Sequence, residues 1–184
     1  MQKKTMSYQE IIDFWFEEIE PKSWFKKDDA FDQTLMSRFG DLHARAEISE
    51  LFTWRGTAEG RLAEIIVLDQ FSRNLYRGTP RAFASDPLAL ALAQEAISQG
   101  LDANLSTVQR TFLYMPYMHS ESKAVHEIAI TLFEKNGKQD NIDYEIRHKA
   151  IIDRFGRYPH RNSILGREST QDELDFLQQP GSSL

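Results

Sequence analysis

Apolar side chains recur at intervals of three and four residues along almost the whole chain. No segment shows the strict alternation of apolar and polar residues that marks a half-buried strand. One stripe with the helical period consists of Phe31, Leu35, Phe39, Leu42 and Ala46. The pattern predicts an all-α fold of seven or eight helices. Since the expected connections are short, successive helices should pack as antiparallel neighbours in a stacked, solenoid-like array.

Capping residues predict where several helices begin. Ser7 with Glu10, and Thr170 with Glu173, have the spacing of a capping box. The expected helices cover residues 7–20, 28–46, 57–75, 86–100, 106–116, 120–137 and 140–156, with a short one from residue 170. We expect residues 1–184 to form a single helical domain, with a loose tail over residues 180–184.

Three boundaries depend on single residues. Asp86 is expected to be the N-cap before Pro87 at the first helical position. Pro116 is expected to break or kink the helix that starts at Ser106, because proline has no N–H to donate. Ser120 is then expected to cap the following helix.

The composition limits the classes of partner. The formal net charge is −6 and the isoelectric point is about 5.4, which argues against a nucleic acid as the main partner. The chain has no cysteine, as is usual for a protein of the reducing cytosol, so we expect a cytoplasmic location. The longest apolar run, Leu88–Ala93, is far shorter than a membrane span, and no secretory signal is apparent near the start.

Polar residues that could bind an anion are concentrated in the segment Arg154–Asn162. It contains Arg154, Arg157, His160, Arg161 and Asn162. Arginine binds phosphate or carboxylate groups through two parallel hydrogen bonds, and the glycine and the proline of this segment restrict its backbone. The alternative interpretation is a structural network in which the arginines pair with internal carboxylates.

A second polar segment, Asp69–Asn74, ends an otherwise apolar helix. Asp69 and Arg73 are four residues apart and share a helix face, and Gln70 and Asn74 form another such pair. This pattern indicates a polar patch at the end of a mostly buried helix. A surface ion pair on a frayed last turn is the alternative interpretation.

The third candidate segment runs from Tyr114 to Ser122. His119 and Glu121 lie near an expected helix N-terminus, where an anion or acid–base chemistry is favourable. Tyr114 either lines a pocket or fills the core. The alternative for the other residues is a simple N-cap with an acidic first turn.

Motifs of known chemistry are missing from the sequence. It contains no metalloprotease HExxH motif, no nucleophile elbow, no phosphate-binding P-loop and no dinucleotide-binding glycine motif. The histidines do not form a tight cluster with acidic residues. We therefore expect neither a metal nor a cofactor.

The three polar segments together resemble the signature segments of a bacterial family, the domain-of-unknown-function family 924. The matching stretches are 68–74, 112–121 and 154–162, and Phe14–Phe16 and Trp24–Phe25 also fit. The family is similar to TPR-like helical proteins, so the resemblance implies an all-α array with a concave face. It implies no particular reaction, because the family has no established activity.

Two functions remain open, and whether the protein is an enzyme is undecided. In the first, the site binds a small anionic ligand bearing a phosphate or carboxylate, with possible acid–base catalysis. The candidate catalytic residues are Asp69, His119, Glu121 and His160. The candidate ligand-binding residues are Gln70, Arg73, Asn74, Tyr114, Arg154, Arg157, Arg161 and Asn162. If His160 lies among arginines, its protonation is disfavoured.

In the second function, the protein is a TPR-like scaffold whose concave face binds a peptide or a protein. Its basic corner would then take a carboxylate such as a peptide C-terminus. Trp24, Phe25 and Trp54 are either part of an interface or core residues. A purely structural role for the polar networks is a third possibility, and the sequence does not indicate the oligomeric state.

Overall fold

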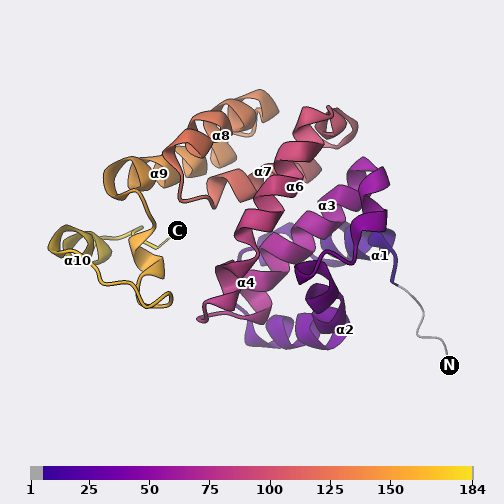
Figure 1. Cartoon of the computed structure of the whole chain (residues 1–184), viewed down its shortest axis with the longest axis horizontal. Helices are drawn as coiled ribbons and strands as arrows, with labels where there is room; N and C mark the ends of the chain where they lie inside the picture. Colours follow the sequence, from indigo (N-terminus) through magenta and orange to yellow (C-terminus); the bar gives the residue numbers. More distant parts are fainter. Residues whose placement is uncertain (1–5, 184) are drawn as a thin grey trace.

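The computed structural model describes residues 6–183, and every ordered element within them is helical (Figure 1). The predicted all-α fold is confirmed. The α-helices are α1 (Tyr8–Asp13), α2 (Asp29–Glu47), α3 (Ala58–Ile66), α4 (Ser72–Leu75), α5 (Arg81–Ala84), α6 (Asp86–Ser98), α7 (Thr107–Met118), α8 (Lys123–Asn136), α9 (Gln139–Phe155) and α10 (Gln171–Leu177). No helix within residues 6–183 has the length and apolar content needed to cross a membrane.

The predicted capping boxes are present. The Ser7 backbone N–H donates to Glu10 Oε2 at 2.8 Å, and Thr170 and Glu173 cap α10 in the same way. Gly156 follows α9 with a φ of 71°, a left-handed conformation that glycine adopts without strain. Short-range sequence signals therefore determine several helix ends.

Three expected boundaries are wrong. Pro116 lies inside α7, which continues to Met118. Helix α8 begins at Lys123 after Ser122, so Ser120 belongs to the connecting turn rather than to the cap. Asp86 is the first residue of α6 and its side chain is engaged by arginines. In each case tertiary contacts outweigh the local preference.

One long helical segment runs through the middle of the fold. Helices α3 and α4 are joined by a π-helical turn, Val67–Phe71, and every residue from Gly60 to Ser72 is buried. Helices α1, α6 and α7 pack against α3, and α2 packs against α4. Because this central helix has no solvent-facing side over most of its length, a polar side chain within it needs an internal partner.

The C-terminal half adds successive helices to this core. Helix α7 packs on α6 and α8, and α8 packs on α9. Figure 1 shows α8 and α9 on one side of α6, with α2 and α4 on the other. The chain after α9 returns to α6, where Arg161 pairs with Asp86 at 3.3 Å. This return closes a space between α4, the end of α7 and α9.

The expected loose tail is attached to α10 within the described residues. Ser182 is buried and its hydroxyl donates to the carbonyl of Leu177 at 3.2 Å. Leu184 lies outside the described residues.

Replacement of Gly60 tests the packing at the start of the central helix. A Cβ added at Gly60 would lie 2.0 Å from the carbonyl oxygen of Trp54, a backbone atom that cannot move independently. We expect Gly60→Ala to lower the free energy of unfolding by about 2–4 kcal/mol in urea denaturation. Gly56→Ala is the control, since its Cβ meets no atom within 4 Å and its effect should stay within about 0.5 kcal/mol.

Candidate functional site

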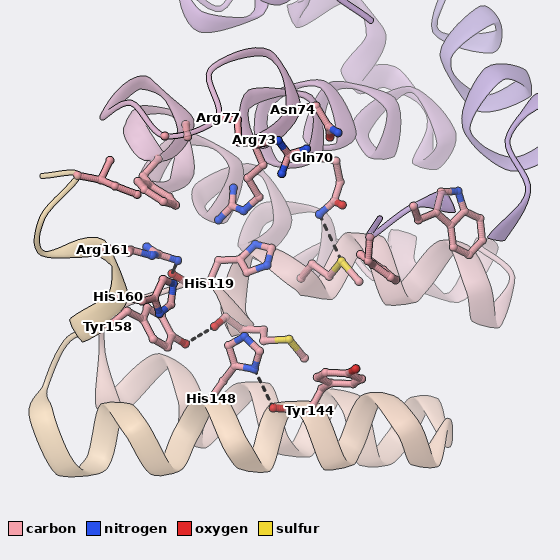
Figure 2. A pocket seen from close by; sticks show the side chains of 18 of the residues that line it. Gln70, Arg73, Asn74, Arg77, His119, Tyr144, His148, Tyr158, His160 and Arg161 are labelled. Atoms are coloured by element: carbon pink, nitrogen blue, oxygen red, sulfur yellow. Dashed lines mark hydrogen bonds between the residues drawn. The ribbon is translucent and has the colours of Figure 1, made fainter. Parts of the chain in front are cut away.

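A cavity of about 560 Å³ lies where three helices meet, a volume within the usual range for small-molecule sites. Each helix contributes a stripe with helical spacing. These stripes are Gln70, Arg73, Asn74 and Arg77 from α4 and the turns on either side of it, Met115, Met118 and His119 from α7 and its end, and Asn141, Tyr144 and His148 from α9. Figure 2 shows the labelled side chains from these three helices around a common space, with His160 and Arg161 at one end.

A buried carboxylate orients the histidine at the end of α7. Asp69 Oδ1 lies 2.7 Å from His119 Nδ1, and its other oxygen accepts a 2.7 Å hydrogen bond from Gln70 Nε2. Burial opposes ionisation of Asp69, but His119 and Arg73 outweigh it and hold the pKa of that carboxyl well below its usual range. Burial, reinforced by the charge of Arg73, lowers the pKa of His119.

The neutral imidazole of His119 therefore donates from Nδ1 to the ionised Asp69. Its Nε2 carries the lone pair and has no hydrogen-bond partner among residues 6–183. In Figure 2 the ring stands in the centre of the cavity. This is the geometry of a general base held in one tautomer by a carboxylate.

Two arginines share one carboxylate beside this pair. Arg73 donates to both oxygens of Asp86 at 2.9 and 3.0 Å, and Arg161 approaches the same group at 3.3 Å. The guanidinium of Arg161 also lies 4.6 Å from the ring centre of Phe83. Burial and the charge of Arg73 lower the pKa of Arg161. The Nε of Arg161 is buried without a partner among the described residues.

The turn that carries His119 is held by three side chains. The carbonyls of residues 118, 119 and 120 accept hydrogen bonds from Tyr158 Oη at 2.5 Å, Arg161 Nη2 at 3.0 Å and His126 Nε2 at 2.8 Å. His126 Nδ1 in turn lies 2.6 Å from the buried carboxyl of Glu145. Bonds to consecutive carbonyls fix the backbone, and with it the direction of the His119 ring.

The sequence of the chain matches a known family over most of its length. A family model described as "Bacterial protein of unknown function (DUF924)" matches residues 11–181. The chain belongs to the DUF924 family. The predicted resemblance is thereby confirmed.

A solved structure supports the same assignment. It is described as "Structure of Protein of Unknown Function ATU0120 from Agrobacterium tumefaciens", and its sequence is 42% identical to this chain. The match covers 93% of this chain and 96% of that chain, with a TM-score of 0.88. No protein with a curated description matches this DUF924 chain.

The structure brings together one group of the predicted site residues of this DUF924 protein. Six of them line the cavity, namely Gln70, Arg73, Asn74, His119, His160 and Arg161. Asp69 lies directly behind His119. Burial, followed by the charge of Arg161, lowers the pKa of His160 to about 4, so His160 is neutral as its position among arginines predicts.

Each of the three predicted segments contributes to the cavity, but the remaining predicted residues lie outside it. Arg157 binds Glu173 at 2.7 Å and Arg154 binds Asp172. Asn162 is buried against Ser169 and Glu173. Their partners all lie in α10 or in the loop just before it.

Glu121 and Tyr114 are placed elsewhere for other reasons. Glu121 accepts two hydrogen bonds from Arg167 at 2.7 and 2.9 Å and one from the backbone N–H of Tyr158. Tyr114 donates to Asp102 at 2.7 Å and lines a smaller cavity elsewhere on α7. Residues 6–183 contain no group of three or more acidic or histidine side chains placed to hold a metal ion.

Sequence reasoning missed part of the lining. Tyr144 and His148 are four residues apart in α9 and therefore share one helix face. Trp24 and Phe25 also line the cavity, although they lie far away in sequence. The spacing of Tyr144 and His148 on α9 is visible in the sequence, whereas the position of Trp24 and Phe25 beside the cavity depends on the tertiary fold.

The buried histidines predict how stability depends on pH. Burial lowers the pKa of His148 to about 3, whereas in the unfolded chain it titrates near pH 6.5. Below about pH 6.5 the unfolded state therefore binds more protons, and the contribution of His148 to stability falls by about 1.4 kcal/mol per pH unit. We expect this part of the slope to vanish in His148→Asn when urea unfolding is measured between about pH 6.5 and pH 5.

The other titratable groups contribute equally to the pH dependence of the wild-type protein and of His148→Asn. The lowered pKa values of His119 and His160 give slopes of the same sign, and the pKa of Glu145, raised by burial, gives the opposite sign. Identical slopes in the two proteins would mean that His148 is not held neutral in the folded state.

Proposed function

We propose that this DUF924 protein binds a small organic anion and moves a proton on it or on a bound water. The observation that carries this proposal is the 2.7 Å pair of Asp69 and His119 at the wall of a cavity that also contains Arg73 and Arg161. A base, its orienting carboxylate and two guanidinium groups in one cavity are the parts that acid–base chemistry on an anion needs.

His119 acts as the general base through Nε2. A lowered pKa keeps the imidazole neutral near pH 7, and Asp69 stabilises the imidazolium that forms when a proton is taken up. No serine or threonine lines the cavity within residues 6–183, so the proton comes from the ligand or from water rather than from a hydroxyl nucleophile of that kind. These are the first steps of eliminations, isomerisations and hydrolyses.

Arg161 and Arg73 bind the anionic group of the ligand. Both are held in place by Asp86, and a guanidinium that is already positioned loses little entropy when a ligand binds. Gln70 and Asn74 supply neutral hydrogen bonds on the same side of the cavity. His160 is kept neutral by burial and by Arg161, so it serves as a neutral donor or acceptor.

A TPR-like scaffold that binds a peptide carboxylate is the second candidate. It is supported by the consecutive packing of α7, α8 and α9, which is typical of helical arrays. The arginines of the cavity would then take the C-terminal carboxylate of the peptide. A cytoplasmic location suits either function and is supported by the lack of cysteine in the sequence.

A binding panel tests the first candidate. Thermal unfolding and calorimetry are run with small carboxylates and phosphate esters, and a compound that binds the folded state raises Tm. We expect Arg161→Gln to weaken binding of the active compounds by about tenfold or more, because charge-assisted hydrogen bonds are lost. Arg154→Gln is the matched control, since Arg154 is exposed and paired with Asp172 outside the cavity.

The proton-transfer step needs a separate variant. His119→Asn should still bind these compounds but lower their turnover, followed by NMR, by about 100-fold or more. Stabilisation by none of the compounds would contradict the proposal, and so would equal weakening in Arg161→Gln and Arg154→Gln. A C-terminal peptide that binds where the small anions do not would favour the scaffold.

A further inference from the structure

We infer that the ligand of this cavity is an amphipathic monocarboxylic acid, with its carboxylate at the Arg161 end and an aliphatic or aromatic body lying along α7. This inference rests on the proposed function and goes further, because it names the chemical class and the orientation of the ligand. It follows from three features of the cavity, which are the order of its side chains along α7, the charge balance of its polar end and its apolar far end.

Helix α7 sets the order of the side chains along the cavity. Arg161 donates to the carbonyl of His119, just beyond the end of the helix. Met115 lies one turn before His119, and its Sδ is 3.4 Å from Gln70 Nε2. Phe112, one turn earlier again, supports the next part of the wall. Seven residues separate Phe112 from His119, which corresponds to about 10 Å along the helix.

Two aromatic residues form the far end of the wall. The ring centre of Trp24 lies 4.9 Å from that of Phe112, and the ring of Phe25 stacks on Phe112 at 6.2 Å. Both Trp24 and Phe25 line the cavity, as does Tyr144 of α9. In Figure 2 Tyr144 lies away from His160 and Arg161, with His148 between them. The cavity thus has two arginines at one end and aromatic rings at the other, where Lys26 follows Phe25 in the lining.

The charge balance favours a single negative charge on the ligand. Arg73 and Arg161 carry two positive charges, and Asp69 and Asp86 carry two negative ones. Burial lowers the pKa of all three histidines that line the cavity, which keeps them neutral. A carboxylate adds one charge to this balanced group, whereas a phosphate monoester near pH 7 adds about two. Two further cations line the cavity, but Arg77 is paired with Asp32, and Lys26 follows Phe25 in the chain. At the Arg161 end the second charge therefore has no further cationic partner, and burying it there is costly.

The position of the base agrees with this orientation. Along α7, Arg161 binds the carbonyl of His119 and Met115 lies one turn before it. The proposed orientation therefore puts the first carbons of the body, rather than the carboxylate, beside the His119 ring. A proton on a carbon next to a carboxylate, or a water bound beside it, lies within reach of a base placed there. The apolar wall then supplies binding energy away from the reacting atoms.

A homologous series of ligands tests the inference. Calorimetry on the full chain measures the dissociation constants of straight-chain carboxylates from acetate to decanoate, together with the matching alkyl phosphates and alcohols. We expect the affinity of the carboxylates to rise about three- to fourfold per methylene until the chain outgrows the wall. Each carboxylate should bind more tightly than the phosphate and the alcohol of equal length.

Phe25→Ala locates the apolar end. Phe25 is 67% exposed, so truncation should leave the fold intact, reduce the gain with chain length and leave acetate binding unchanged. Phe52→Ala is the matched control, because Phe52 is 63% exposed and lies outside the cavity. Equal effects of the two variants on the longer acids would overturn the inference.

The remaining outcomes separate this inference from the proposed function. Binding of acetate that is lost in Arg161→Gln but shows no gain with chain length would overturn the amphipathic ligand and leave the anion site in place. Tighter binding of the phosphates than of the carboxylates would overturn the monoanion in the same way. Failure of every carboxylate and phosphate to bind would contradict both.

Discussion

A buried negative charge in the middle of the fold is the constraint from which the site follows. Asp69 lies in the π-helical turn of the central helix, where no water reaches its carboxylate. An ionised group in this position needs several partners, and loss of one partner of a buried ion pair typically costs about 3–5 kcal/mol. Arg73 comes from the same helix and His119 from the end of α7. The requirement for these partners joins two helices and fixes the base in one tautomer.

The segment Arg154–Asn162 makes two sets of contacts, one with α10 and one with the end of α7 beside the cavity. Arg157 and Asn162 bind Glu173 and hold α10 in place. Tyr158 and Arg161 contact α7 instead and donate to the backbone carbonyls of Met118 and His119. The segment Arg154–Asn162 therefore both stabilises the C-terminal helix and positions His119. The arginines of this basic segment therefore have different roles. Of the three, only Arg161, which reaches Asp86, lines the cavity.

The sequence predicted the helical fold, the capping boxes, the family and the cavity residues from the central helix to His119. These depend on spacing within one helix or on local hydrogen bonds, which a single sequence displays. The failures depend on contacts between distant elements. Pro116 lies inside α7 because that helix is buried on several sides. Arg157 lies outside the cavity because its guanidinium pairs with Glu173. Trp24 and Phe25 join the cavity through their packing on Phe112, which no local pattern reveals.

The proposed chemistry depends on an ionised Asp69 that holds a neutral His119 with Nε2 toward the cavity. Nitrogen-detected NMR of the histidine rings measures this directly, because the two ring nitrogens report the tautomer and its titration. We predict the Nδ1–H tautomer for His119 near pH 7 and a titration midpoint below the ordinary value of about 6.5. An Nε2–H tautomer, or an imidazolium that persists above about pH 7, would contradict the account.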